Sequence, residues 1–222
     1  MHELIIRRLG RLTPKLPILS EKSDQLDLHD RINWRRYWLV DPLDGTKEFI
    51  KRNGEFTVNI ALIEDGKPIL GVVCAPALEV CYFAAQGGVA SKLESGKNLV
   101  TIKAQPMQAE RPITVVASRS HSDARTTALL ERLGEHNSIN MGSSLKLCLV
   151  AEGMAHFYPR LGPTMEWDTA AAHAVVNAAG GVVHDIAGDE LHYNKPDLHN
   201  PEFFVRAKTD RYFEQFVKDF HE

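Results

Sequence analysis

Cysteines are scarce in this sequence, and it has no long apolar run. Only three cysteines occur among 222 residues, at positions 74, 81 and 148, and none stands in a C-x-x-C pair. This excludes a disulfide-dense miniprotein and predicts reduced thiols in a cytoplasm-like compartment. The longest apolar stretches, such as residues 69–78, are far too short to span a bilayer. The first eight residues lack the apolar core and cleavage site of a signal peptide. We therefore expect a cytoplasmic protein without a transmembrane segment, and peripheral association with the inner face of the cell membrane is left open.

An excess of basic charge is also missing. Lys and Arg number 26 and Asp and Glu 29, which gives a net charge of -3. This balance excludes a nucleic-acid polymer as the expected partner. The composition, 44% hydrophobic and 25% charged, excludes a disordered chain or a collagen-like repeat. The length suits one large domain or two small ones, and monomer and homodimer both stay open.

The first half of the chain is typical of a strand-rich meander that follows a helix. Leu4, Ile5, Leu9 and Leu12 have helical spacing, and the helix begins without a capping side chain. An uncapped start indicates either a frayed first helix, which is common at chain ends, or missing upstream sequence. A hairpin turn is predicted at residues 64–67. Strands are expected at residues 16–19, 37–40, 56–63, 69–75 and 81–85.

The second half alternates strands with helices, which indicates an α/β arrangement. We expect strands at residues 113–117 and from 182, and helices at residues 126–133, 145–152 and 169–179. The composition shifts near residues 103–112, where prolines flank a polar stretch. The predicted domains are therefore an α+β metal-binding domain, residues 1–107, and an α/β substrate-binding domain, residues 108–222.

An acidic loop, D-P-L-D-G-T at residues 41–46, follows a short apolar run. Asp41 and Asp44 stand at the end of a predicted buried strand, so their like charges repel unless a cation lies between them. Mg²⁺ prefers such hard oxygen ligands, together with phosphate oxygens. The Leu43 carbonyl is a further possible ligand, and the Thr46 hydroxyl could orient a water.

The loop has two other possible interpretations. An isolated D-P-x-D is more often a solvated turn in which an aspartate caps a short helix. Aspartyl-phosphate phosphatases of the haloacid dehalogenase type also end a strand with acids before Gly-Thr. Their two aspartates are two residues apart, whereas here the spacing is three with a proline between, so this alternative is a minor one.

Two more acids are candidates. Asp168, in E-W-D-T-A-A, stands where a loop becomes an Ala-rich helix, and on its own it would be interpreted as the N-cap of that helix. Glu21 follows the first predicted strand, and on its own it would be interpreted as an ordinary exposed glutamate.

Taken together, the motifs resemble the inositol monophosphatase superfamily, whose signatures are D-P-[IL]-D-G-T and a later W-D-x-A-A followed by A-G-G. The first is present at residues 41–46 and the second at 167–171, with A-G-G at 179–181. Within the superfamily the chain looks most like the bacterial 3'(2'),5'-bisphosphate nucleotidases, and the likeness covers essentially the whole chain. The supporting stretches are residues 41–49, 53–59, 118–121, 142–146 and 158–160.

The resemblance implies a layered α-β-α-β-α sandwich and a Mg²⁺-dependent phosphomonoesterase with two or three ions per site. Its substrate would be the small molecule 3'-phosphoadenosine 5'-phosphate, cleaved to AMP and phosphate by a metal-activated water. Lithium is expected to inhibit by competing at a magnesium position. The implied metal ligands are Glu21, Asp41, the Leu43 carbonyl, Asp44 and Asp168. The implied catalytic residues are Glu21, Asp41, Asp44 and Thr46.

The second phosphate of such a substrate needs cationic partners. Lys146 and Arg160 are candidates for this role. In inositol-preferring relatives an acidic residue near position 160 can accept hydrogen bonds from sugar hydroxyls, whereas an arginine there suits a second phosphate. Ser143 and Ser144 precede a predicted helix, whose N-terminus favours anions. Each of these is, taken singly, as readily a surface charge or a helix cap. The full set of implied substrate-binding residues is Leu43, Asp44, Gly45, Thr46, Ser118, His121, Ser143, Ser144, Lys146, Tyr158, Arg160 and Asp168.

Two alternative functions stay open at this point. One is a phosphatase for inositol or another sugar phosphate. The other is a shortened, catalytically impaired relative that binds metal or nucleotide. Two departures from the family pattern motivate this second alternative. Relatives carry an upstream T-x-A-D segment that the given sequence does not contain, and Lys22 stands where the pattern has a second glutamate.

Overall fold

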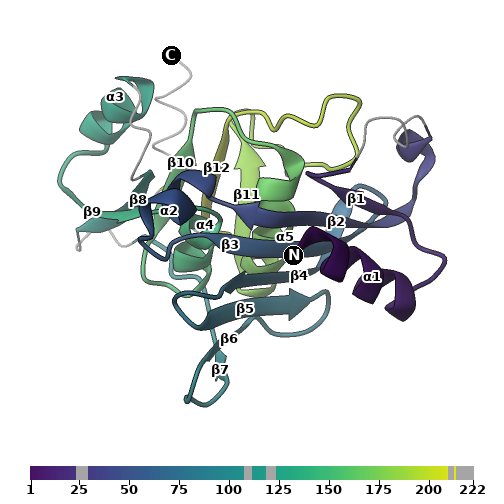
Figure 1. Ribbon diagram of the computed structural model, residues 1–222. Coiled ribbons are helices and arrows are strands. Elements are labelled where there is room, and N and C mark those ends of the chain that lie inside the picture. Colours follow the sequence, from purple (N-terminus) through teal and green to yellow (C-terminus); the bar gives the residue numbers. More distant parts are fainter. Residues whose placement is uncertain (24–29, 108–111, 119–123, 210–212, 214–222) are drawn as a thin grey trace.

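The computed structural model describes residues 1–23, 30–107, 112–118, 124–209 and 213, and its helices and strands form five layers (Figure 1). A seven-stranded sheet has the order β1-β2-β3-β4-β5-β6-β7, and a five-stranded sheet has the order β11-β12-β10-β8-β9. The strands are β1 (Ile18–Ser20), β2 (Arg36–Asp44), β3 (Thr57–Glu64), β4 (Lys67–Ala75), β5 (Val80–Ala85), β6 (Ser91–Glu94), β7 (Val100–Thr101), β8 (Ile113–Ser118), β9 (His136–Met141), β10 (Phe157–Arg160), β11 (Gly181–Asp185) and β12 (Phe203–Ala207). The helices are α1 (His2–Leu12), the short 3-10 helix η2 (Arg31–Asn33), α2 (Thr46–Lys51), α3 (Ala124–Leu133), α4 (Leu145–Ala151) and α5 (Glu166–Ala178).

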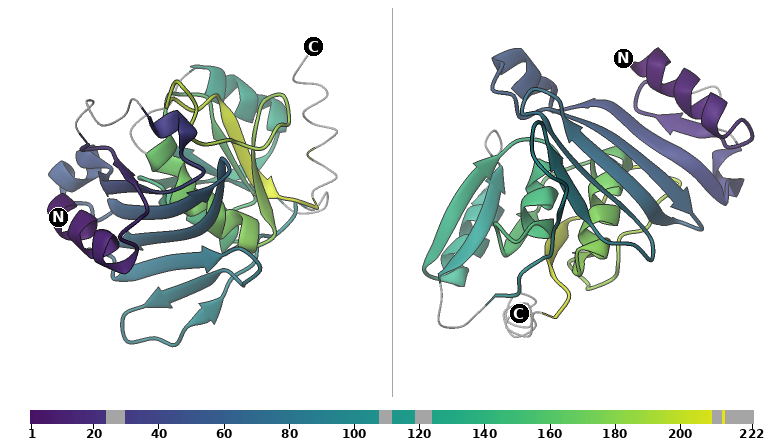
Figure 2. Two further views of the ribbon diagram at one scale, coloured as in Figure 1. Left: turned by 90° about the vertical axis from the view of Figure 1, so that its right-hand side faces the viewer. Right: turned by 90° about the horizontal axis from the view of Figure 1, so that it is seen from below.

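Helices cover both outer faces and fill the space between the sheets (Figure 2). On one outer face, Leu9 of α1 packs with Trp38 and Val40 of the seven-stranded sheet. In the middle layer, α5 contacts β3, β4 and β5 on one side and β11 on the other, while α4 contacts β8, β10 and β12. On the opposite outer face, Leu129 of α3 packs with Val115 of β8. The expected α-β-α-β-α sandwich, with an α+β first half and an α/β second half, is confirmed.

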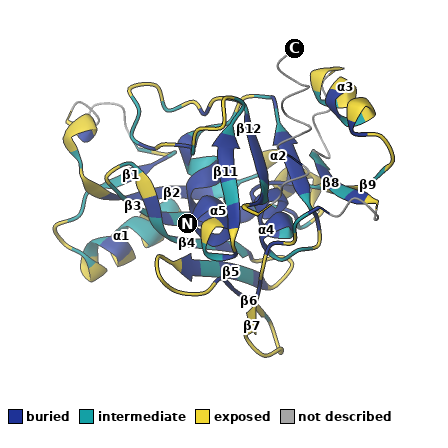
Figure 3. Ribbon diagram, turned by 180° about the vertical axis from the view of Figure 1, so that it is seen from behind, coloured by how far each residue is buried: buried dark blue, intermediate teal, exposed yellow. Residues whose placement is uncertain are grey.

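The middle layer is the most deeply buried part of the molecule (Figure 3). Alanines along α5 allow its backbone to approach the seven-stranded sheet closely, and residues 170–172 are each at most 1% exposed. Gly71 of β4 receives this approach, because a Cβ at that position would lie 2.0 Å from the carbonyl oxygen of Ala171. The position of α5, which carries Asp168, therefore depends on a glycine in a strand.

We expect the substitution Gly71→Ala to destabilise the fold by roughly 1–3 kcal/mol, because an overpacked core must shift its backbone. The free energy of unfolding in urea measures this effect. Gly10→Ala in α1 is the matched control, since a Cβ there meets nothing within 4 Å and alanine stabilises a helix interior. Equal unfolding midpoints for the two variants would contradict the close approach.

Some sequence expectations were incomplete or wrong. Of the four apolar residues with helical spacing in α1, Leu9 and Ile5 pack against the sheet, whereas Leu4 and Leu12 are 47% and 71% exposed. The strand expected at residues 37–40 continues through the acidic loop to Asp44. Strands β6, β7, β9, β10 and β12 were not anticipated. The boundary between residues 107 and 108 stays a proposal; its neighbours 108–111 lie outside the described residues.

The expectation of three free thiols is also wrong. Cys74 and Cys81 form a disulfide, and Cys148 is free and buried. The two bonded residues face each other in the antiparallel pair β4–β5, with their Cα atoms 4.1 Å apart. The inference of a reducing compartment thereby loses its ground. In the ranges described, no helix combines the length and apolar character that crossing a membrane requires.

Candidate functional site

The acidic loop lies where β2 leaves regular pairing. Asp41 is opposite Asn59 of β3 and Asp44 is opposite Thr57, with a register irregularity between the two pairs. The Leu43 N–H donates to Asp41 Oδ1 over 2.9 Å, which folds the loop back on itself. Asp41 is only 2% exposed. The loop therefore presents two acids from a buried strand end, as the sequence predicts.

Asp168 joins these two acids from α5. The helix begins two residues earlier than Asp168, so the aspartate is not its N-cap; instead Asp168 Oδ2 accepts the N–H of Met165, 2.8 Å away. One carboxylate oxygen from each of Asp41, Asp44 and Asp168 lies within 4.8 Å of the others. The strand end and the helix start thus bring three carboxylates to one point.

Burial and mutual repulsion raise the pKa values of these three carboxyl groups and so disfavour their charged forms. Burial first, and then the charge of Asp44, raise the pKa of Asp41 to about 9. The same two causes raise the pKa of Asp168 to about 7. Burial also raises the pKa of Asp44, against the opposing effects of Lys146 and the Ser144 N–H. Oxygen ligands crowded in this way fit a hard divalent cation, whose charge offsets both the repulsion and the burial.

Glu21, the fourth expected acid, is not one of the three whose oxygens lie within 4.8 Å of one another. It follows β1, and its N–H donates to the Val40 carbonyl oxygen over 3.0 Å. Its charge contributes to the raised pKa of Asp41 and of Asp168. Glu21 Oε2 is buried with no hydrogen-bond partner among the residues described, whereas Oε1 accepts Lys22 Nζ at 3.0 Å. One oxygen is therefore oriented without a protein partner, as a metal ligand would be.

Gly45 and Thr46 follow the acids. Gly45 has a φ of 85°, and a Cβ there would lie 2.0 Å from Ser143 Oγ, so only glycine fits. Thr46 is exposed and begins α2. The glycine thus lets a turn from the second half of the chain approach Asp44.

That turn, residues 142–144, connects β9 to α4. The Ser144 N–H donates to Asp44 Oδ2 over 2.7 Å, and the Ser143 hydroxyl donates to the Asp44 carbonyl oxygen over 3.0 Å. Lys146 Nζ donates to the Ser143 carbonyl oxygen over 2.7 Å and lies 5.8 Å from the centre of the Tyr158 ring. Burial lowers the pKa of Lys146 to about 8, opposed by the charge of Asp44. A buried lysine is thus held beside the acids.

A pocket of about 230 Å³ joins the acids to the cations. Arg160, at the end of β10, donates to the Pro163 carbonyl oxygen over 3.0 Å, and its Nε is buried without a partner in the described part of the chain. Burial raises the pKa of Tyr158, so its phenol stays protonated. The pocket is lined by Asp44, Gly45, Thr46, Lys47, Glu48, Ser143, Ser144, Lys146, Leu147, Tyr158, Arg160, Thr164, Asp168, Thr169 and Phe203.

Two expected residues cannot be placed. The Ser118 side chain and all of His121 lie outside the described residues. Conversely, sequence reasoning missed two side chains that bond Asp44 Oδ2, Thr57 Oγ1 at 3.3 Å and Asn59 Nδ2 at 3.4 Å. Both residues lie in the stretch 53–59, which supports the family resemblance. That resemblance is the only sequence signal that could have identified them.

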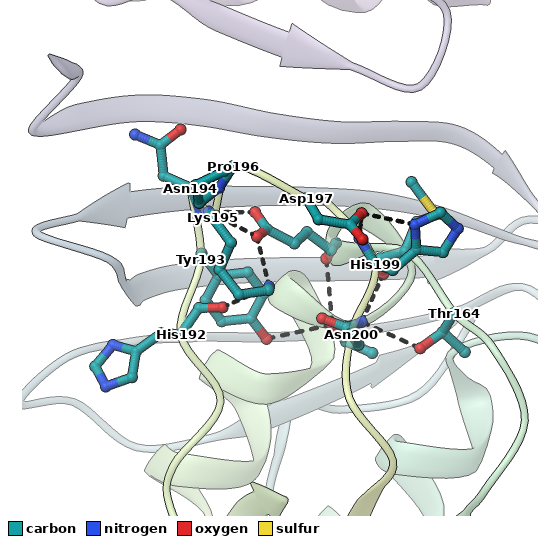
Figure 4. A network of polar contacts seen from close by, with 12 residues as sticks. Thr164, His192, Tyr193, Asn194, Lys195, Pro196, Asp197, His199 and Asn200 are labelled. Atoms are coloured by element: carbon teal, nitrogen blue, oxygen red, sulfur yellow. Dashed lines mark hydrogen bonds and ion pairs between the residues drawn. The ribbon is translucent and has the colours of Figure 1, made fainter. Parts of the chain in front are cut away.

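A buried network fixes the start of α5 (Figure 4). Glu166 is 0% exposed and accepts the N–H of Asn194 at 2.7 Å and Nζ of Lys195 at 2.6 Å. The Asn200 side chain donates to the Met165 carbonyl oxygen at 2.8 Å and to Thr169 Oγ1 at 3.1 Å. These bonds hold the turn of helix that carries Asp168.

Comparisons with known proteins agree with this geometry. The model of the inositol monophosphatase family matches residues 1–222. The 3'(2'),5'-bisphosphate nucleotidases CysQ of Salmonella typhimurium and of Escherichia coli strain K12 are each 56% identical to this chain over 205 residues, which is 92% of this chain and 81% of the relative.

Solved structures give the same result. The crystal structure of CysQ from Bacteroides thetaiotaomicron, described as a bacterial member of the inositol monophosphatase family, matches with a TM-score of 0.83 at 44% identity over 94% of this chain and 82% of that one. Inositol monophosphatase II from Staphylococcus aureus matches with a TM-score of 0.81 at 19% identity over 99% of this chain and 79% of that one, a likeness of fold alone. The fold, the acidic cluster and the match along all 222 residues lead to one conclusion: the chain belongs to the inositol monophosphatase family.

Proposed function

We propose that this protein is a Mg²⁺-dependent phosphomonoesterase that converts 3'-phosphoadenosine 5'-phosphate to AMP and phosphate. The observation that carries the proposal is one pocket that is lined by Asp44 and Asp168, two of the three clustered carboxylates, and by the basic side chains of Lys146 and Arg160. A substrate with two phosphates suits this lining, because one phosphate can bind to the acids through metal cations while the other binds to basic side chains. The relatives that are 56% identical to this chain over 205 residues carry the name of that activity.

The proposed metal ligands are Glu21, Asp41, Asp44, Asp168 and the Leu43 carbonyl, for two or three ions. When bound, Mg²⁺ supplies the positive charge that activates a water and offsets the charge on the phosphate. The protein's own contribution is orientation. Asp44 is fixed by three donors, and in the proposal the exposed Thr46 hydroxyl orients the attacking water.

In the same pocket, Arg160 and Lys146 would bind the phosphate that is kept. The guanidinium offers a planar pair of donors to a phosphate, whereas the ammonium acts as a point charge. Ser143 and Ser144, before α4, and Tyr158, beneath Lys146, would line the nucleotide. Ser118 and His121 stay candidates for the same role. A monomer or a homodimer stays a proposal. A cytoplasmic location also stays one, and it is now supported by the similarity to the CysQ proteins and not by the cysteines.

The test is phosphate release in the presence of Mg²⁺. The purified chain is assayed with 3'-phosphoadenosine 5'-phosphate and, in parallel, with inositol 1-phosphate, and Asp44→Asn serves as the inactive control. We expect the value of kcat/KM for the nucleotide to exceed that for inositol phosphate by at least about tenfold, or about 1.4 kcal/mol. Faster turnover of inositol phosphate would assign the second activity instead. Release no greater than that of Asp44→Asn would overturn the proposed function.

A further inference from the structure

The turn at residues 142–144 carries two separate contacts of the pocket. Through the Ser144 N–H it holds Asp44, and the 2.7 Å bond is the shortest of the three that this carboxylate oxygen accepts. Through the Ser143 carbonyl it holds Lys146 Nζ, also at 2.7 Å. The backbone conformation of this turn therefore determines the positions of both Asp44 and Lys146.

This backbone is not in a relaxed conformation. Ser143 has a φ of 51°, in the left-handed region where a side chain with a Cβ is disfavoured. A residue held in that region needs surrounding contacts that determine its conformation, because alone it would return to negative φ. The conformation of Ser143 thus depends on what holds the turn on either side.

Glu55 holds the turn from the first half of the chain. Its Oε2 accepts the Gly142 N–H over 2.8 Å in a buried bond, and the residue is 9% exposed. The backbone of Glu55 is itself fixed, because its N–H donates to Asn53 Oδ1 over 3.0 Å. A Cβ on Gly142 would lie 3.0 Å from the Glu55 carbonyl oxygen and 2.6 Å from Glu48 Cγ, so the turn is seated directly on this segment.

We propose that Glu55 is a positioning residue, which fixes the turn at residues 142–144 through the Gly142 N–H and thereby sets both Asp44 and Lys146. Glu55 does not line the pocket, so it acts through the turn and not on the substrate. The expected effect of Glu55 on turnover rests on the proposed function. The expected effect of Glu55 on the turn at residues 142–144 does not depend on any activity.

The experiment compares Glu55→Leu with Glu55→Gln. Leucine keeps much of the volume but cannot accept a hydrogen bond, whereas glutamine keeps an acceptor oxygen in a neutral side chain. For Glu55→Leu we expect a loss of about tenfold in kcat/KM for the nucleotide, with KM raised. We also expect weaker binding of Mn²⁺ and of AMP by calorimetry and faster hydrogen exchange at the Ser144 amide. Glu55→Gln should restore each of these toward wild type.

Glu152→Leu is the matched control. The Glu152 side chain is also 9% exposed, and its oxygens accept Tyr82 OH at 3.1 Å and Lys92 Nζ at 2.7 Å, away from the pocket. Its loss should lower thermal stability without changing KM or the exchange of the Ser144 amide. If Glu55→Leu does not fold, Glu55→Asp keeps the charge and withdraws the acceptor by one methylene, and the same effects are expected.

The outcomes separate the two proposals. Wild-type exchange and ligand binding in Glu55→Leu, or failure of Glu55→Gln to restore them in a folded protein, would overturn the positioning role. An inactive wild type whose Ser144 exchange and Mn²⁺ binding still depend on Glu55 would overturn the proposed function and leave the positioning role supported.

Discussion

Replacing Asp41 by asparagine abolishes phosphatase activity and, in metal-free buffer, makes the protein more stable. Asp41 is 2% exposed, and the crowding with Asp44 and Asp168 makes its charge costly to bury without a cation. Asparagine neither carries a charge nor has to take up a proton on folding, and its oxygen can still accept the Leu43 N–H that Asp41 Oδ1 accepts now. We expect a gain of about 1–3 kcal/mol in the unfolding free energy of the metal-free protein.

The same substitution should reverse its sign once Mg²⁺ is added. A ligand that binds only the folded state stabilises it by about 2.7 kcal/mol at a concentration 100 times its dissociation constant. The wild type gains this increment, and Asp41→Asn gains much less of it because a charged ligand atom is gone. Turnover should fall by at least about 1,000-fold, equivalent to roughly 4 kcal/mol of transition-state stabilisation.

Thermal unfolding with and without Mg²⁺, together with phosphate release, measures both effects. Asp65→Asn is the control. Asp65 is exposed, its carboxylate is paired with Arg35 at 2.9 Å, and it does not belong to the group of three clustered acids. It should change neither activity nor the Mg²⁺ increment. A metal-free Asp41→Asn protein that is less stable than wild type would show that the three carboxylates do not repel one another as the structure implies.

The position of this cluster was predictable because each acid has a strong local signal. The apolar residues before Asp41 indicate a buried strand, and proline and glycine in the next four residues indicate its end. The alanines after Asp168 indicate a buried helix face. That these two places meet came only from the resemblance, because periodicity along one chain does not say which elements are neighbours.

The residues that hold the cluster were not predictable in the same way. Thr57 and Asn59 meet Asp44 because β2 and β3 pair with an irregular register after Asp41, and no local pattern fixes such a register. The disulfide was missed for the same reason, since Cys74 and Cys81 are partners only in the observed register of β4 and β5.

Strand β9 is a different kind of miss. Residues 136–141 read H-N-S-I-N-M, a mostly polar stretch in which Ile139 is the single residue of the β-branched or aromatic kind that favours strands. They adopt strand conformation as the edge of the five-stranded sheet, where they pair in parallel with β8. Tertiary pairing here outweighs local preference, and it matters for function because β9 leads directly into the turn that bonds Asp44.

Arg160→Gln should remove the preference for a substrate with two phosphates. The guanidinium lines the pocket and its Nε is buried without a partner within the described ranges, so an incoming phosphate can take up an existing, already desolvated donor. Charge-assisted hydrogen bonds of this kind contribute about 1.5–3 kcal/mol. We therefore expect kcat/KM for 3'-phosphoadenosine 5'-phosphate to fall by about 100-fold, mainly through a higher KM.

A substrate with one phosphate, 4-nitrophenyl phosphate, reports on the reaction centre alone and should change by less than about threefold. Arg206→Gln is the matched control, because Arg206 is also half-buried but bonds His184 and lies 4.6 Å from the Phe213 ring, outside the pocket. Equal losses for both substrates would mean that Arg160 supports the reaction centre and not the second phosphate. Lys146 remains in this variant, but its Nζ is bonded to the Ser143 carbonyl oxygen at 2.7 Å and acts as a point charge, so we expect it to replace the planar pair of guanidinium donors only in part.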